Sequence, residues 1–147
     1  MSLSPRVTFY HAPNSRSGGT RALLEELGAD YDLHVLNLKR GEQREAPYLA
    51  INPMGKVPAI RHGEALVTEQ PAVFIYLADL YPQTGLAPAI GDPLRGPYLR
   101  WMVFYGSMFK LVRQRPVIRA YIDRVTSRPA WQRAAAADAA LAAGQAE

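Results

Sequence analysis

The sequence predicts an α/β fold of alternating strands and helices, followed by a region built from helices alone. Three observations lead to this prediction. Short β-type runs alternate with helical patterns as far as residue 82, a Gly- and Pro-rich segment follows, and the remainder has a helical pattern. The chain has 147 residues, of which 48% are apolar and 20% charged, so it is long enough for one ordinary domain or two small ones.

The first elements predict a βαβ unit. Residues 7–10 are a β-type run that stops at a turn cluster, residues 11–19. The helix that follows carries three leucines on one face, and Gly28 suits the left-handed residue that ends a helix. Residues 31–35 alternate polar and apolar side chains, which predicts a second strand. The short links predict that the two strands are parallel.

The next segment predicts a hairpin and a covering helix. Residues 41–52 are polar and loosely helical, and the apolar runs 57–60 and 65–67 flank His62-Gly63-Glu64, a typical hairpin signal. In the following helix, apolar residues recur at i, i+3, i+4 and i+7, and Pro71 is tolerated in its first turn. The order βαβ-α-ββα is the thioredoxin-like arrangement, a mixed sheet covered by helices on both faces.

The Gly- and Pro-rich residues 83–92 predict a linker between two domains. We therefore expect a first domain over residues 1–82 and an all-helical domain over residues 93–147. The second domain has two long helical patterns, and Pro129 interrupts the later one.

The composition excludes several kinds of chemistry. The chain has no cysteine, so disulfides, thiolate metal sites and a thiol nucleophile of its own are excluded. Its three histidines lie far apart and show no ligand spacing, so we expect no metal. No run approaches the ~20 apolar residues of a membrane span and no secretory leader is evident, so we expect a cytoplasmic protein without a membrane partner.

The net charge of +4 is unevenly distributed. Residues 1–92 carry 8 basic and 10 acidic side chains (−2), whereas residues 93–147 carry 9 and 3 (+6). The arginines of the second part are spread along helical segments, which favours a solvated helix face over a nucleic-acid surface. We therefore expect no nucleic-acid partner, and the same charge is compatible with attraction for small anions.

Several motifs resemble, in order and at these separations, the N-terminal domain of glutathione S-transferases. They are Leu24-Glu25-Glu26-Leu27-Gly28, Asn52-Pro53-Met54-Gly55-Lys56-Val57-Pro58-Ala59-Ile60, Thr68-Glu69-Gln70 and the helix containing Tyr76-Leu77. Residues 92–105 and 115–130 resemble the first helix and the end of the family's helical domain. The resemblance implies glutathione as co-substrate, a small electrophile as second substrate, and a homodimer.

The resemblance is interrupted between residues 105 and 113. Only 55 residues follow Asp92, and the family's middle helices, including one that opens with a Ser/Thr-x-x-Asp capping box, have no counterpart. We expect that an internal stretch is missing from the sequence, the alternative being a genuine deletion. So short a helical part would bury little core alone and would depend on docking to the first domain.

The implied reaction needs a thiolate made from the thiol of glutathione. A free thiol has a pKa near ~8.5, so only a few per cent is ionised at neutral pH. Hydrogen-bond donation to the sulfur and the positive end of a helix both favour the anion. The turn at residues 14–17 would supply both.

Three side chains of this turn are candidate donors. Pro13-Asn14-Ser15 resembles the Pro-Gly-Ser of delta-class enzymes and points to Ser15, which we rank first. The interval from Ser17 to Arg21 resembles the Ser-x-x-x-Arg of theta-class enzymes and points to Ser17. Asn14 is the third candidate, since asparagine donates in some fungal and bacterial relatives. From the residues alone, helix capping would explain both serines.

Further glutathione-binding residues follow from the same resemblance. Val57-Pro58 matches the family's cis-proline position, where the Val57 backbone pairs in antiparallel fashion with the cysteinyl unit. Glu69 and Gln70 fall at the family's Glu-Ser pair. Glu69 suits the γ-glutamyl ammonium, and Gln70 together with the first N–H groups of the helix at Pro71 suits its carboxylate. Lys56 matches a position that reaches the glycyl carboxylate in some classes, and an exposed loop lysine is an equal alternative.

Phe104, Tyr105 and Met108 recur at helical spacing in the helix that borders the electrophile pocket of the family. An apolar lining there would fit aromatic or alkyl electrophiles. The leading hypothesis is thus a detoxifying glutathione transferase. The alternative is a non-catalytic glutathione-binding protein with the same fold that acts as a scaffold or regulator. A thioredoxin-type reductase is excluded because disulfide exchange needs a cysteine.

Overall fold

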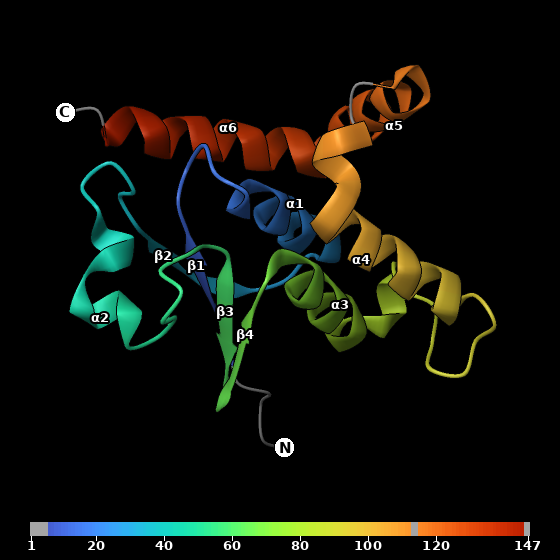
Figure 1. Cartoon of the computed structure of the whole chain (residues 1–147), viewed down its shortest axis with the longest axis horizontal. Coiled ribbons are helices and arrows are strands. Elements are labelled where there is room, and N and C mark those ends of the chain that lie inside the picture. The colour runs from blue at the N-terminus through green and yellow to red at the C-terminus, as the bar shows by residue number, and fades with distance from the viewer. Residues whose placement is uncertain (1–5, 113–114, 146–147) are drawn as a thin grey trace.

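A four-stranded mixed sheet lies at the centre of the computed structural model, which describes residues 6–112 and 115–145 (Figure 1). The strand order is β2-β1-β3-β4, with β1 (Val7–His11) parallel to β2 (Tyr31–Val35). Strand β3 (Ala59–His62) is antiparallel to β1 and to β4 (Ala65–Thr68). This topology confirms the thioredoxin-like arrangement expected from the order of the elements.

Two helices cover one face of the sheet and contain its main core. Helix α1 (Ser17–Leu27) connects β1 to β2 and ends at Gly28, whose φ of 60° is the left-handed conformation expected there. Helix α3 (Gln70–Leu80) follows β4 and packs beside α1. The buried side chains between these helices and the sheet are Val7, Phe9, Leu24, Leu27, Ile60, Val73 and Leu77.

The opposite face of the sheet is covered by the segment between β2 and β3. This segment forms the 3₁₀ turn η1 (Glu42–Arg44) and the short helix α2 (Ala46–Leu49). A second, smaller core of Tyr10, Leu36, Tyr48 and Ala59 lies there. Because successive strand residues point to opposite faces, Phe9 and Tyr10 enter different cores.

The strand expected at residues 57–60 is shorter in the structure. Strand β3 begins only at Ala59. Pro58 has no N–H with which to join the ladder, so the segment before Ala59 leaves the sheet. The Val57–Pro58 peptide bond is cis, as expected from the resemblance.

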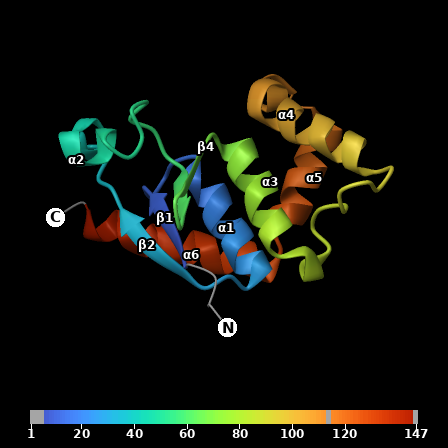
Figure 2. The ribbon, with the colours of Figure 1, turned by 90° about the horizontal axis from the view of Figure 1, so that it is seen from below.

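The helical region follows the short 3₁₀ turn η2 (Pro82–Thr84) and consists of α4 (Arg95–Val112), α5 (Pro116–Thr126) and α6 (Pro129–Gly144). The break expected at Pro129 separates α5 from α6. Helix α6 packs along α1, and α4 packs against α3, as Figures 1 and 2 show from two sides. Helix α5 has no buried residue, so this region gains its burial by docking to the first, as expected.

The interruption expected between residues 105 and 113 falls where α4 continues to Val112, and residue 113 lies outside the described residues. The division into two domains with a linker at 83–92 stays a prediction. Within the described ranges, no helix is long and apolar enough to cross a membrane.

Candidate functional site

The register of the sheet brings three loops together at one end. Tyr10 of β1 pairs with Ala59 of β3, which in turn pairs with Thr68 of β4. The turn after β1, the segment before β3 and the start of α3 therefore lie next to one another. They carry the sequence-predicted glutathione residues Asn14, Ser15, Ser17, Lys56, Val57, Pro58, Glu69 and Gln70.

Ser17, the first residue of α1, is fully buried beneath this end of the sheet. Its Oγ accepts a hydrogen bond from the Ala12 N–H at 3.1 Å. The same Oγ lies 2.8 Å from His11 Nδ1 and 2.7 Å from Ser15 Oγ. All the hydrogen-bonding neighbours of the Ser17 hydroxyl are therefore groups of the protein itself.

Ser15 is only partly buried and lies at the surface of the turn. Its Oγ donates to the Ala12 carbonyl at 2.7 Å and accepts from the Ser17 N–H at 3.1 Å. The second bond satisfies an N–H of the first helical turn, which agrees with the capping alternative. Ser15 and the exposed Asn14 also line a pocket of about 280 Å³ between this turn and α6, whose lining does not include Ser17.

His11, at the end of β1, is a candidate that the sequence analysis did not single out. Its fully buried ring has Nε2 2.6 Å from Asp138 Oδ1 on α6, with the carboxylate out of line with the ring N–H. Arg21 Nη1 lies 3.4 Å from the same oxygen. Burial lowers the pKa of His11 from its ordinary 6.5, Asp138 opposes this shift and Arg21 adds to it. His11 is therefore neutral at pH 7.

Glu69 and Gln70 differ sharply although they are adjacent. Glu69 is exposed and has a φ of 66°, an uncommon conformation for a residue with a side chain. Gln70 is buried, and its Nε2 donates to the Arg16 carbonyl at 2.6 Å while its Oε1 accepts from Tyr105 Oη at 3.2 Å. The Gln70 side chain is thus occupied by protein partners, and the first N–H groups of α3 are the donors left at this point.

A hydrogen-bonded loop presents the segment before β3. The Lys56 carbonyl accepts from Tyr48 Oη at 2.7 Å and from Asn52 Nδ2 at 2.8 Å. Burial raises the pKa of Tyr48 to about 12, so its phenol remains a donor. Among the described residues, none forms a hydrogen bond with the N–H or C=O of Val57, which leaves that backbone available to an extended peptide. The Lys56 side chain is exposed.

The aromatic candidates on α4 do not share one environment. Tyr105 stacks on Phe74 with ring centroids 5.9 Å apart, and burial raises its pKa. It lines a pocket of about 550 Å³ between α3 and α4, together with Glu69 and Arg16. Phe104 instead meets Trp101 edge-on at 5.4 Å. The side chain of Met108 lies outside the described residues.

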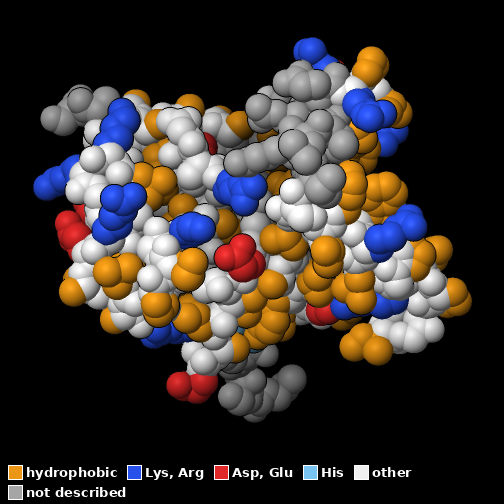
Figure 3. Space-filling view, viewed as in Figure 1, with side chains coloured by type: hydrophobic (Ala, Val, Ile, Leu, Met, Phe, Trp, Pro, Cys, Tyr) orange, Lys and Arg blue, Asp and Glu red, His pale blue; other side chains and the backbone are white. Residues whose placement is uncertain are grey.

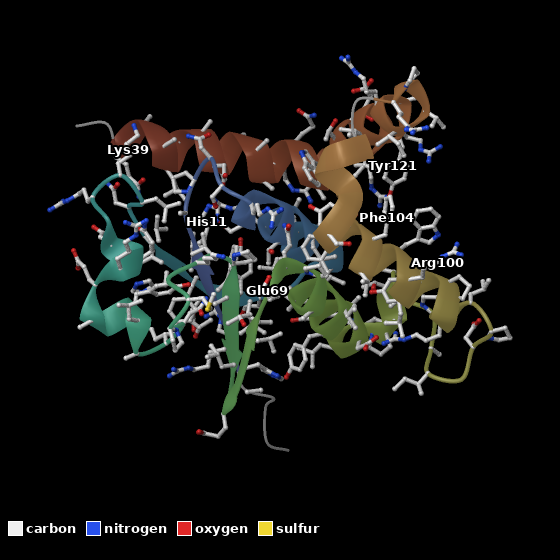
Figure 4. The ribbon with its side chains drawn as sticks, viewed as in Figure 1. His11, Lys39, Glu69, Arg100, Phe104 and Tyr121 are labelled. Atoms are coloured by element: carbon white, nitrogen blue, oxygen red, sulfur yellow. The ribbon has the colours of Figure 1, made fainter. Side chains whose placement is uncertain are left out.

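Charged side chains of both signs lie near the middle of one face of the molecule. In Figure 3 an acidic side chain lies near the middle of the visible face, with Lys or Arg side chains above it and to one side. In Figure 4, seen from the same side, His11 and Glu69 lie near one end of the sheet, whereas Phe104 and Tyr121 lie on the helical side. In the described part of the chain, no group of three potential ligands is arranged for a metal ion.

Comparison with known proteins identifies the family. The family model described as the glutathione S-transferase N-terminal domain matches residues 5–79, which are 75 of the 147 residues. The chain belongs to the glutathione S-transferase family. This family assignment agrees with the resemblance found in the motifs.

Curated relatives of this transferase-family chain match about three-fifths of its length. Maleylacetoacetate isomerase of Pseudomonas aeruginosa is 41% identical over 91 residues, covering 60% of this chain and 41% of that protein. A zeta-class glutathione S-transferase of Euphorbia esula is 36% identical over 86 residues, covering 58% and 38% respectively. The chain thus spans about two-fifths of the length of these relatives.

Solved structures show the same fold. A sphingomonad glutathione S-transferase complexed with glutathione has a TM-score of 0.78 at 23% identity, covering 90% of this chain and 98% of that one. A theta-class enzyme from Xanthomonas axonopodis pv. citri with glutathione bound has a TM-score of 0.65 at 29% identity, covering 74% and 52%.

Proposed function

We propose that the protein binds glutathione across the end of the sheet and transfers its sulfur to a small electrophile, with Ser15 as the hydrogen-bond donor to the thiolate. One observation carries this proposal. Ser15 borders open space at the N-terminus of α1, at the sheet end that also carries the unpaired backbone of Val57 and the start of α3. The family membership supplies glutathione as the ligand for such a corner.

The chemistry asked of this corner is to favour a thiolate over a thiol. A hydroxyl that donates to sulfur and a helix N-terminus both stabilise the negative charge. Ser15 is suited to this role because it lines the pocket, whereas Ser17 is fully buried and does not. Asn14 remains the alternative donor, because it is exposed in the same wall.

The remaining contacts follow the tripeptide outward from its sulfur. The Val57 N–H and C=O would pair with the cysteinyl unit, and the exposed Glu69 would face the γ-glutamyl ammonium. Because the Gln70 side chain is occupied, the first N–H groups of α3 would hold the γ-glutamyl carboxylate. Lys56 would reach the glycyl carboxylate.

The second substrate would enter beside Ser15. The pocket of about 280 Å³ is walled by Trp131 and small alanine side chains of α6, which suits a small, partly apolar electrophile. A role for Phe104, Tyr105 and Met108 in electrophile binding stays a prediction, as do the homodimer and the cytoplasmic location.

A second candidate function comes from the relative with 41% identity, which is named a maleylacetoacetate isomerase. In an isomerisation the glutathione is returned after each turnover, whereas in a conjugation it is consumed. Measuring free thiol during turnover of each substrate class therefore separates the two candidates.

The proposal is tested by the rate of conjugation of glutathione to an activated aryl halide. Ser15→Ala is expected to lower kcat/KM by roughly 10²-fold, the size of effect seen when one oriented donor is removed. Asn14→Ala tests the alternative donor in the same wall, and Ser15 as the donor predicts a smaller loss for Asn14→Ala than for Ser15→Ala. Full activity in Ser15→Ala, or a wild-type protein that does not bind glutathione, would contradict the proposal.

A further inference from the structure

A continuous line of polar groups runs from the pocket into the interior. Ser15 lines the pocket, and its Oγ is 2.7 Å from Ser17 Oγ. Ser17 Oγ is 2.8 Å from His11 Nδ1, and His11 Nε2 is 2.6 Å from Asp138 Oδ1 on α6. Beyond Ser15 every member of the line is wholly or largely buried, so no bulk solvent interrupts it.

We infer that this line is a proton relay in which His11 receives the thiol proton of glutathione through Ser15 and Ser17, with Asp138 of α6 compensating the charge that His11 gains. The inference rests on the proposed function, because it presumes a glutathione thiol next to Ser15. In this relay His11 acts on the thiol through Ser15 and Ser17, and Asp138 acts through His11, although Asp138 also lines the pocket.

The hydrogen-bond capacity of both serines fits the state before transfer. A hydroxyl has one proton to donate and two lone pairs to accept with. With the His11 proton on Nε2, Ser17 Oγ can accept from the Ala12 N–H and from Ser15 and donate to the bare Nδ1, the Ala12 carbonyl 3.1 Å away being its other acceptor. Ser15 Oγ accepts from the Ser17 N–H and, when its proton turns from the Ala12 carbonyl to Ser17 Oγ, keeps one lone pair for the S–H group.

The hydrogen-bond capacity of Ser15 and Ser17 also fits the state after proton transfer. The S–H bond breaks and its proton passes to Ser15 Oγ, the Ser15 proton passes to Ser17 Oγ, and the Ser17 proton passes to His11 Nδ1. Ser15 then donates to the thiolate and Ser17 donates to Ser15. The products are a thiolate and an imidazolium, so charge and protons balance without a further reactant.

The charges around His11 suit a reversible acceptor. Asp138, from α6, stabilises the imidazolium, and Arg21, from α1, opposes it. Burial lowers the pKa of His11 and thus disfavours the imidazolium, so Asp138 is the group that supports the protonated ring.

The relay is tested by titrating the ultraviolet absorbance of the glutathione thiolate bound to the full chain. Asparagine cannot titrate, so Asp138→Asn and His11→Asn each remove one ionisable member of the line. In both variants the apparent pKa of the bound thiol is expected to rise by about one unit, a tenfold change in its ionisation constant. Arg21→Gln is expected to move it in the opposite direction, because the charge opposing the imidazolium is removed. Structural damage alone would not produce shifts of opposite sign.

Glu26→Gln is the matched control. It also breaks an ion pair between α1 and the start of α6, Glu26 to Arg128 at 2.6 Å, but that pair does not contact His11. It is expected to leave the thiol pKa unchanged, and binding of S-methylglutathione reports that each variant keeps its fold.

The outcomes separate the relay from the proposed function. If the wild-type protein ionises bound glutathione and Asp138→Asn leaves the thiol pKa unchanged, the relay is overturned while the proposed function stands. If the wild-type protein does not bind glutathione, the proposed function fails first. Should His11→Asn not fold, the opposite shifts expected for Asp138→Asn and Arg21→Gln decide the question.

Discussion

The sheet region and the helical region of this chain are stabilised in different ways. In the first, Phe9, Leu24, Ile60, Val73 and Leu77 are fully buried between α1, α3 and the sheet. Among the described residues of the second, the buried ones are two alanines of α6. Apolar side chains on α4 and α5 are exposed instead, such as Trp101 at 54% and Val117 at 73%.

This difference indicates that the helical region buries its side chains mainly by packing against the sheet region. Its α4 lies on α3 and its α6 lies on α1. The same docking places Asp138 beside His11 and Tyr105 beside Gln70, so it also completes the candidate site. Loss of the docking would therefore leave the main core of the sheet region in place but would remove Asp138 and Tyr105 from the candidate site.

The largest expected effect is a core truncation in the sheet region. Leu77→Ala removes a fully buried side chain and is expected to lower the free energy of unfolding by about 2–5 kcal/mol. Val117→Ala, on exposed α5, is expected to change it by less than about 0.5 kcal/mol. Urea denaturation of both variants checks the contrast, and equal losses would contradict it.

A smaller effect is expected where α4 meets α3. A Cβ at Gly106 would lie 2.7 Å from Pro71 Cγ, closer than packed atoms approach, so Gly106→Ala is expected to cost about 1–3 kcal/mol. Gly96, near the start of the same helix, has nothing within 4 Å of such a Cβ. Gly96→Ala is therefore expected to be neutral or stabilising by up to about 1 kcal/mol. Thermal unfolding of the pair tests the docking directly.

A pH effect is expected from His11. Since its pKa is lowered in the folded chain, the unfolded chain binds more protons below about pH 6.5, and stability falls as the pH drops from there towards the folded pKa. His11→Asn is expected to lose this contribution. Denaturation curves across pH 5–8, without glutathione, measure the difference, and identical slopes for the two proteins would rule the contribution out.

The smallest effect is expected at the surface between α1 and α6. Arg133 Nε lies 3.3 Å from Glu25 Oε2, and both side chains are partly exposed. Arg133→Gln is expected to change stability by less than about 0.5 kcal/mol, with the change shrinking as salt is added. A large, salt-independent loss would mean that α6 docks through charge rather than through packing.

Local patterns were sufficient to predict most of the sheet region. Gly28, the hairpin around Gly63, the helix after residue 70 and the Val57–Pro58 segment all depend on neighbours within a few residues. The family motifs in that region then indicated where glutathione would bind. These features are encoded locally and are visible in one sequence.

Contacts between distant parts of the chain could not be predicted in this way. The sequence analysis gave Gln70 a ligand role, and nothing near it reveals that Arg16 and Tyr105 occupy its side chain. Likewise, His11 and Asp138 come from opposite ends of the chain. The one available signal was Asp138 itself, a lone carboxylate in an alanine-rich helix.

The central claim is that Ser15 holds the sulfur of a glutathione bound at the end of the sheet. A crystal structure of the full chain with glutathione tests it most directly. The sulfur is predicted within hydrogen-bond distance of Ser15 Oγ, with the cysteinyl backbone against Val57 and the γ-glutamyl group at Glu69. A tripeptide bound elsewhere, or a sulfur remote from Ser15, would contradict the claim.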